Sequence, residues 1–416
     1  MTTLQEARRR LLVRAPRVAT TDPGALSYFL IGGAVLLLLL IGVVMVLSAS
    51  TIISIRDNEG NPYADFLSQG RFVLIGLPLM LIASRLPVGF YKAISWPALG
   101  GAFALQMLIF TPLARGQGGN VNWIVIPGTS QTIQPSEFMK LALALWLGVV
   151  LARKGELLRE WRHVVMPGLL VSLFAVGLVM AGWDMGTAIV LVMLIAGAMW
   201  VGGVPARWFV GGGLGGVFAV TLLVFASESR MTRVMHFLGI GEVDPTGAGY
   251  QSRHGLWGLG TGGLTGVGLG ASREKWAYLP EAHNDFIFAI LGEELGLLGT
   301  LLVLVLFGVL AYGLLRMIRR HPDPFVKVTT AGVTCWIVGQ ALVNVGVVIG
   351  MLPVIGVPLP LVSAGGSAMI STLLAIGVML SFARTEPGAR KALTASGSSV
   401  RRSLAIVGGR LGRRHG

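Results

Sequence analysis

Long runs of uncharged residues recur along this chain and limit what it can fold into. Residues 28–47 contain no charge over twenty positions, and residues 295–315 contain none over twenty-one. A helix needs about 20 apolar residues to cross the hydrocarbon core of a bilayer. A helix on the surface of a soluble core would show a polar face within that length. The runs therefore predict an all-α, polytopic membrane protein.

The charge content supports a membrane class and explains the basic character of the chain. Only 12% of residues are charged, against about 25% in soluble domains. The net charge of +14 would suggest nucleic acid in a soluble protein, but here the basic residues lie between the apolar runs. Membrane topology accounts for them, so no nucleic-acid partner is expected. The single cysteine, Cys335, excludes an intrachain disulfide and disfavours a Cys/His zinc site.

We expect ten membrane-spanning helices, the first retained and not cleaved as a signal peptide. The eighth is long, and Glu293 and Glu294 in its first part suggest that it is broken or tilted. The expected spans lie near residues 28–49, 72–89, 93–113, 137–152, 164–181, 185–202, 207–226, 284–315, 328–351 and 361–382.

The basic residues predict the orientation of these spans. With ten spans, both tails and the loops after the fourth and eighth spans fall on one side, and all four are rich in Arg and Lys. By the positive-inside rule that side is the cytoplasm, so both termini are expected there. Residues 1–27 are then a basic cytoplasmic tail, 28–384 the membrane domain, and 385–416 a basic cytoplasmic tail that we expect to be disordered.

The segment 227–283 is expected to form a large extracytoplasmic loop. Loops of this length are usually functional or disordered, and its aromatic content favours an ordered, functional loop. Its glycines at 258–270 stand near basic residues, which suits an anionic, phosphate-bearing ligand. Anchoring to anionic lipid headgroups is an equal alternative for the basic residues, which are Arg230, Arg233, Arg253, Arg273 and Lys275.

Asp285 is the acidic residue that we expect to do chemistry. It follows Glu281 and His283 within five residues, and the apolar run of a span begins immediately after it. It is therefore expected at the amino-terminal end of a helix, near the outer membrane face. A helix cap formed by Asn284 or Asp285 explains the same residues equally well.

Other polar residues lie in or beside the spans. Glu137 and Lys140, after Gln134, are spaced as a helical ion pair that is either structural or functional. Asp184 lies in a very short outer loop. Intramembrane charges are costly, so each is a hypothesis for a functional site.

Two further groups lie in the last spans. Gln340 and Asn344 share a helix face, and buried amides of this kind more often hold helices together than bind a ligand. Ser363 to Ser367, with Gly365 and Gly366, either leave backbone N–H groups free for a ligand or form a small-residue helix contact. No P-loop, Rossmann or nucleophile-elbow motif stands in a suitable context, so no organic cofactor is expected.

Ten short segments follow one another along most of the membrane region. They are Val46–Ser50, Gln134–Glu137, Asp184–Thr187, Arg230–Arg233, Gly249–Gln251, Leu279–Phe288, Gly292–Gly296, Gln340–Gly346, Leu352–Pro360 and Ser363–Ser367. In this order and at this spacing they resemble the SEDS family, the polytopic glycosyltransferases of bacterial wall synthesis, which implies a bacterial plasma membrane. Val46–Ser50 and Pro280–His283 favour the division branch of the family over the elongation branch. Departures from the family pattern are Asn122 for a common arginine, His254-Gly255 for a common Gln-Ser pair, and Ala364 and Ala368 for a common tyrosine and serine.

The resemblance implies polymerisation of lipid II at the division septum, with undecaprenyl diphosphate as leaving group. Asp285 matches the catalytic aspartate of the family and is expected to be the general base. Lys275, Arg230 and Arg233 are candidates to contact the diphosphate. The prenyl chain is expected in a groove between spans. The other candidate substrate-binding residues are Glu137, Lys140, Asp184, Gln251, Glu281, His283, Asn344, Ser363, Gly365, Gly366 and Ser367.

The resemblance also implies partners and a candidate cofactor. A divalent cation, Mg or Mn, is a candidate, although no ligand cluster identifies its site. The implied partners are lipid II, a class B penicillin-binding protein transpeptidase, divisome activator proteins and membrane lipids. The alternatives are an elongation-type polymerase, a lipid II flippase and a non-catalytic division scaffold. Polar residues gather toward the outer face, which argues against a path through the whole bilayer for a flippase.

Overall fold

Helices lie at all ten places where the sequence predicts a span. The computed structural model describes residues 24–57, 60–117, 120–129, 131–225, 228–238, 240, 248–276 and 278–395. The helices at the ten places are α2 (Leu26–Asp57), α3 (Ala64–Ala83), α4 (Val88–Met107), α5 (Pro135–Lys154), α7 (Leu170–Ala181), α8 (Met185–Gly202), α9 (Ala206–Phe225), α12 (Ile287–Arg320), α13 (Pro324–Val348) and α14 (Gly366–Ala383).

Eight helical stretches of the described chain are long and apolar enough to cross a membrane. They comprise α2, α3, α4 with its following turn, α7 with the turns before it, α8, α12, α13 and α14. Of the other two, α5 carries Glu137 and Lys140, and the apolar part of α9 is the shorter stretch Ala206–Leu222. The predicted all-α polytopic class is confirmed, while the number of ten spans and the orientation stay predictions.

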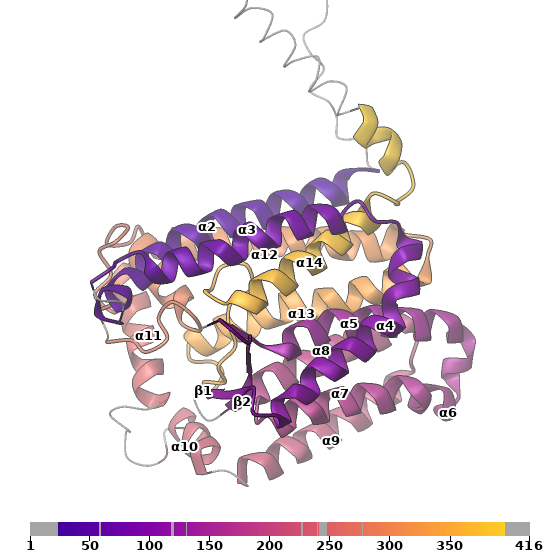
Figure 1. Ribbon diagram of the computed structural model, residues 1–416, viewed down its shortest axis with the longest axis horizontal. Coiled ribbons are helices and arrows are strands. Elements are labelled where there is room, and N and C mark those ends of the chain that lie inside the picture. The colour runs from indigo at the N-terminus through magenta and orange to yellow at the C-terminus, as the bar shows by residue number, and fades with distance from the viewer. Residues whose placement is uncertain are drawn as a thin grey trace, which may run out of the picture.

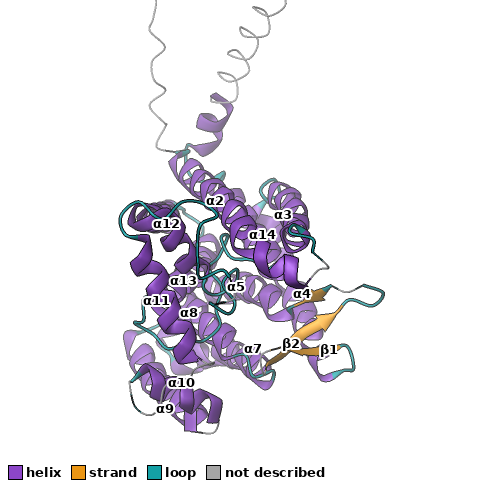
Figure 2. Cartoon of the chain, turned by 90° about the vertical axis from the view of Figure 1, so that its left-hand side faces the viewer, coloured by secondary structure: helices purple, strands orange, loops and turns teal. Residues whose placement is uncertain are grey.

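The core of the bundle is built around α5. Between Pro135 and Leu151 only Phe138 is not fully buried. The neighbours of α5 are α4, α8 and α13, and α13 also packs along α8. On the outside α2 packs on α12 and α3 on α14, as Figures 1 and 2 show. The helix α5 is the least apolar of the central helices because it carries an ion pair that is enclosed by the bundle.

Small elements fill the connections between the long helices. The turn η1 (Leu108–Phe110) leads into an antiparallel sheet of β1 (Ala114–Gln117), β2 (Asn120–Val125) and β3 (Thr132–Ile133), in that order. Turns η2 (Gly155–Arg159) and η3 (Val165–Leu169) flank the short α6 (Trp161–Val164). The predicted large loop contains α10 (Glu228–Phe237) and α11 (Ala248–Gly262), which lie toward the same end of the bundle as the strands (Figure 1).

Several predicted boundaries are wrong. The second span begins at Ala64 and not at 72. The charged residues Asp65 and Arg71 pointed to a later start, but they lie inside α3, because a helix that extends beyond the hydrocarbon core tolerates charges there. The third begins at Val88, directly after Pro87. The last begins at Gly366 and not at 361, because Leu361 adopts a φ of 67°, which a right-handed helix excludes.

The predicted break in the eighth span is confirmed at Gly296, whose φ is 67° and ψ −164°. The segment 263–268 takes up the backbone groups that the break frees. Val267 N–H donates to Glu293 O at 2.9 Å, and Leu297 N–H donates to Gly263 O at 2.9 Å. A Cβ atom at position 296 would lie 2.4 Å from the backbone nitrogen of Gly266, so only glycine fits this approach. The break is thus bonded to the loop that precedes Asp285.

The predicted disorder of the carboxy-terminal tail is wrong for its first part. Glu386 is buried, and its carboxylate lies 3.5 Å from Arg316 Nη1 of α12. Ala389 and Ala392 are also buried. The tail segments 1–23 and 396–416 lie outside the described residues, and the predictions for them stay predictions.

Candidate active site

Asp285 lies in a turn that ends one residue before α12. The residue at the cap position is Phe286, and no side chain caps this helix end. The helix-cap interpretation of Asn284 or Asp285 is therefore wrong. The turn is held from within instead, because Phe286 N–H donates to Glu281 O at 3.3 Å and Asn284 Nδ2 donates to Glu281 Oε2 at 2.6 Å. Glu281 has a φ of 55°, which is uncommon for a residue with a side chain.

The Asp285 carboxyl is poised near neutral pH. Its side chain is only partly exposed, and burial is the largest of the causes that raise the pKa of Asp285 to about 7. The negative charges of Glu281 and Asp184 contribute to this rise, and the Arg233 guanidinium opposes it. A carboxyl with a pKa near the working pH is suited to accept and release a proton.

Two remote segments hold the backbone of this turn. Asn344 Nδ2 donates to the carbonyls of Asp285 and Val357, both at 2.7 Å. Ser363 Oγ donates to Asn284 O at 2.7 Å, and Ala364 N–H donates to His283 O at 3.0 Å. Asn344 lies in α13, and Ser363 lies in the segment before α14. The turn is therefore fixed by α13 and by the segment before α14, and not by its own helix.

The segment 352–362 forms one wall beside Asp285. Most of its apolar side chains from Val354 onward are buried, and Gln340 Nε2 holds it by donating to Pro358 O at 2.9 Å. Gly356 is exposed, with a φ of 69°, and a Cβ there would lie 3.5 Å from Asp285 Oδ2. Sequence reasoning missed Gly356; its only signal was a glycine within a proline-rich segment. The missing side chain keeps this side of the carboxylate open.

Glu137 and Lys140 form a buried ion pair with an Nζ–Oε1 distance of 2.7 Å. Ser371 Oγ donates to the other oxygen of Glu137 at 3.0 Å. Lys140 Nζ donates to Gln340 Oε1 at 3.3 Å and lies 4.8 Å from the centre of the Trp336 ring. Protein groups satisfy both charges, so this placement favours the structural interpretation. Through Gln340 the pair also supports the segment beside Asp285.

Asp184 caps α8 and orders the start of α5. Its carboxylate accepts from Thr187 N at 2.8 Å, from Thr187 Oγ1 at 2.7 Å and from Gln134 Nε2 at 2.8 Å. Gln134 N–H donates to Ser367 Oγ at 3.2 Å. Asp184 and Ser367 thus lie close to the site but have partners within the protein.

The basic candidates are placed differently from one another. Lys275 is buried, 3.1 Å from Glu294 Oε1, and donates to Ser48 Oγ at 3.2 Å and Gly270 O at 2.7 Å. These contacts favour holding the loop on the broken α12 over contacting a diphosphate. Arg233 is half-buried on α10 and donates to Val354 O at 3.4 Å, beside the site. The side chain of Arg230 lies outside the described part of the chain.

The remaining candidates lie around the site. His283 Nδ1 is buried without a hydrogen-bond partner among the described residues. Gln251 is half-buried on α11, and Gly365 N–H donates to Gln69 Oε1 at 3.0 Å. A Cβ on Gly366 would lie 2.6 Å from the Phe72 ring, which favours the small-residue helix contact. Within the described residues no group of three or more His, Cys, Asp or Glu is arranged to hold a metal ion, so the divalent cation stays a prediction.

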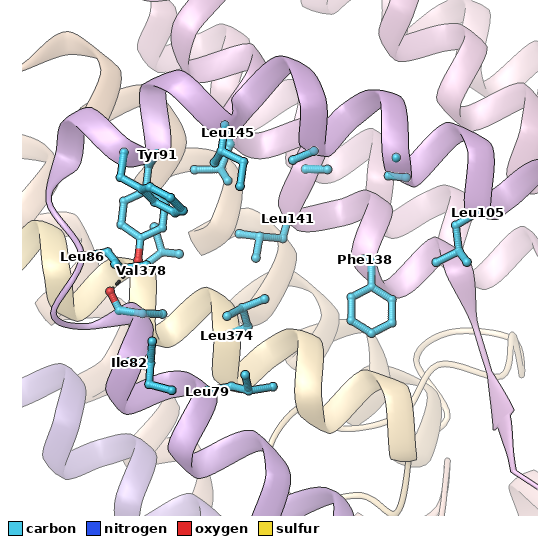
Figure 3. A pocket seen from close by; sticks show the side chains of 17 residues that line it. Leu79, Ile82, Leu86, Tyr91, Leu105, Phe138, Leu141, Leu145, Leu374 and Val378 are labelled. Carbon is cyan, nitrogen blue, oxygen red and sulfur yellow. Dashed lines mark hydrogen bonds between the residues drawn. The ribbon is translucent and has the colours of Figure 1, made fainter. Parts of the chain in front are cut away.

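An apolar cavity of about 450 Å³ lies between α3, α4, α5 and α14. Figure 3 shows the side chains that line it, which are aliphatic apart from rings such as those of Tyr91 and Phe138. Ile82, Phe90 and Ile94 in its wall are also 58%, 40% and 36% exposed, so the cavity opens toward the lipid-facing surface. Its other walls include Leu79, Leu86, Leu141, Leu374 and Val378.

Comparisons with known proteins agree with this architecture. The family described as "Cell cycle protein" (FtsW, RodA and SpoVE) matches residues 29–387. The chain is 38% identical over 370 residues to the probable peptidoglycan glycosyltransferase FtsW of Mycobacterium tuberculosis, covering 89% of this chain and 70% of that one. It is 36% identical over 352 residues to stage V sporulation protein E of Bacillus subtilis, covering 84% and 94%.

Solved structures show the same fold. A chain of a peptidoglycan synthase complex matches with a TM-score of 0.69 at 24% identity, over 86% of this chain and 97% of that one. Thermus thermophilus RodA matches with a TM-score of 0.64 at 25% identity, over 89% and 99%. The prediction of a SEDS glycosyltransferase closest to the division branch is confirmed. The chain belongs to the FtsW/RodA/SpoVE family of cell cycle proteins, whose members include membrane glycosyltransferases of the bacterial cell wall.

Proposed function

We propose that this protein polymerises lipid II into glycan strands at the division septum, with Asp285 as general base. One observation carries the proposal. The Asp285 carboxyl has a pKa of about 7 and lies in a turn fixed by α13 and by the segment before α14, where it serves no helix as a cap. A carboxylate with only a structural role would cap its own helix or pair with a cation. Here the strain at Glu281 and the open side at Gly356 favour a working carboxylate.

In the proposed step the hydroxyl oxygen of the acceptor sugar attacks the anomeric carbon of the donor. The bond from that carbon to the diphosphate oxygen breaks, and the configuration inverts. Asp285 takes the hydroxyl proton, so negative charge moves to the leaving undecaprenyl diphosphate. Arg233, which bonds the Val354 carbonyl beside the site, is the side chain that we expect to contact this diphosphate. A divalent cation, Mg or Mn, would supply the remaining charge neutralisation.

The apolar cavity between α3, α4, α5 and α14 supports a place for the prenyl chain. It opens toward the lipid-facing surface, and its lining is almost wholly aliphatic and aromatic. A prenyl chain that enters from the membrane would therefore not separate buried polar groups from their hydrogen-bond partners.

The proposed partners are a class B penicillin-binding protein transpeptidase and divisome activator proteins. The similar solved complex is described as coordinating polymerization and crosslinking, which supports a transpeptidase partner. The relatives named FtsW support the division role over elongation.

The test is lipid II polymerisation by purified protein with its transpeptidase partner. Asp285→Asn is expected to fold and to form no polymer, because the amide cannot accept the proton. Asp323→Asn is the matched control, since Asp323 caps α13 away from the site and lies on a surface ion pair. Polymer formation by Asp285→Asn at the wild-type rate would refute the assignment. A flippase or a scaffold would form no polymer even as wild type.

A further inference from the structure

Four aromatic rings gather on α11 and on the loop before Asp285. Three stand on one face of α11, namely Tyr250, His254 and Trp257. The His254 ring centre lies 4.1 Å from Tyr250 and 4.8 Å from Trp257. Tyr278, from the loop, lies parallel to His254 within 6° at 6.3 Å. We call these four rings the ring platform.

The central ring of the ring platform is held by a carboxylate, and two of the other rings are exposed. His254 Nδ1 lies 2.6 Å from Glu274 Oε2, and each of these side chains is only 12% exposed. Trp257 and Tyr278 are 52% and 55% exposed. The central ring is thus oriented by a partner that is itself little exposed, while Trp257 and Tyr278 offer ring surface to the outside. Rings held in advance lose little conformational entropy when a ligand binds.

The helix that carries most of the ring platform packs against the turn that holds Asp285. Gly255, the residue after His254, packs against Phe286, and a Cβ there would lie 3.1 Å from that ring. Phe286 is the residue after Asp285. The helix α11 also runs along α12, the helix that Asp285 precedes. The helix that carries the ring platform therefore lies against the residue that follows Asp285.

We propose that the ring platform binds the growing glycan strand, a site that rests on the proposed polymerase function. Pyranose rings present faces of C–H groups and edges of hydroxyl groups. The C–H faces stack on aromatic faces, whose π electrons are partly negative, and the hydroxyls stay in water. Amphipathic rings that merely anchor a protein at the membrane interface need no central ring held by a carboxylate. The orientation of His254 by Glu274 therefore favours a ligand over an anchor.

Two variants remove rings without removing the fold. Trp257→Ala removes an exposed ring. His254→Gln removes the central ring and keeps a donor for Glu274, and glutamine is the common residue at this place in the family. Trp276→Ala is the matched control, because Trp276 is 60% exposed on the same loop as Tyr278 and lies outside the ring platform.

The first measurement is binding of fluorescent, lipid-free, uncross-linked glycan strands of defined length to the full-length protein in detergent. Wild type is expected to bind, and Trp257→Ala and His254→Gln to bind about three- to tenfold more weakly, the range for one lost aromatic contact. Trp276→Ala should bind as wild type. Asp285→Asn should also bind as wild type, because binding needs no proton transfer. Equal weakening by Trp257→Ala and Trp276→Ala would show interfacial anchoring and overturn the proposal.

The second measurement is the length of the polymer made from lipid II. Weaker holding of the strand should shorten the product of Trp257→Ala and His254→Gln relative to Trp276→Ala. Wild type that polymerises lipid II but binds no lipid-free strand would overturn the ring platform and leave the polymerase function standing. Strand binding by a wild type that never polymerises would instead overturn the proposed function.

Discussion

Replacing Lys140 by methionine should destabilise the protein far more than replacing a surface lysine. The side chains of Lys140 and Glu137 are 2% and 4% exposed, with 2.7 Å between their charged atoms. Methionine fills much of the lysine volume but leaves the Glu137 carboxylate buried without a cation. Removing one member of such a pair costs about 3–5 kcal/mol. Lys92→Met is the matched control, because the Lys92–Asp323 pair is 43% and 26% exposed and is worth about 0–1 kcal/mol.

The measurement is the apparent Tm of purified protein in detergent. At about 2 °C per kcal/mol, Lys140→Met should melt about 6 °C or more below wild type. The double variant Lys140→Met with Glu137→Gln should recover most of this loss, since a neutral amide still bonds Ser371 and leaves no buried charge. If the double variant melts no higher than Lys140→Met alone, the loss comes from packing and not from the uncompensated carboxylate, and the reasoning is refuted.

Three further predictions concern the site. Gly356→Ala should lower kcat for polymerisation at least tenfold, because φ at this position is 69° and the new methyl group would lie 3.5 Å from Asp285 Oδ2; unchanged kcat would contradict the open side of the carboxylate. Asn344→Leu should lower kcat more than it raises KM for lipid II, since Asn344 is buried and positions the Asp285 backbone; an effect on KM alone would argue for direct substrate binding. Ala98→Phe adds a ring to the wall of the apolar cavity and should raise KM for lipid II but not for a short-prenyl analogue. Equal effects on both substrates would place the prenyl chain elsewhere.

The positions of the spans could be predicted from the sequence because hydropathy over about 20 residues is a local property. The break in α12 was also within reach, since two adjacent glutamates in an apolar run require partners. Boundaries were harder, because Asp65 and Arg71 lie in a helix that continues beyond the apolar region. The strands were missed because β1 and β3 are only four and two residues long, and β2 does not keep an alternation of polar and apolar residues through its six positions.

Some features of the site could likewise be predicted from the sequence, and others could not. Asp285 could be singled out from the residues around it, but the choice between cap and catalyst depended on where the turn ends, which is set by α13 and the segment before α14. The contacts of Asn344 with Asp285 and of Ser363 with Asn284 join residues 59 and 79 positions apart. No local pattern reveals such pairings. Lys275 shows the opposite case, because its charge and glycine-rich surroundings suggested a ligand while Glu294 holds it inside the protein.

The pH dependence of polymerisation tests the central claim most directly. A general base must be ionised, so kcat/KM should be low in acid, rise with an apparent pKa of about 7 and level off above it. Glu281→Gln removes a negative charge that raises this pKa and should move the rise to lower pH, while Arg233→Gln should move it to higher pH. A profile that stays flat through this range, or that fails to move in opposite directions in the two variants, would contradict Asp285 as the base.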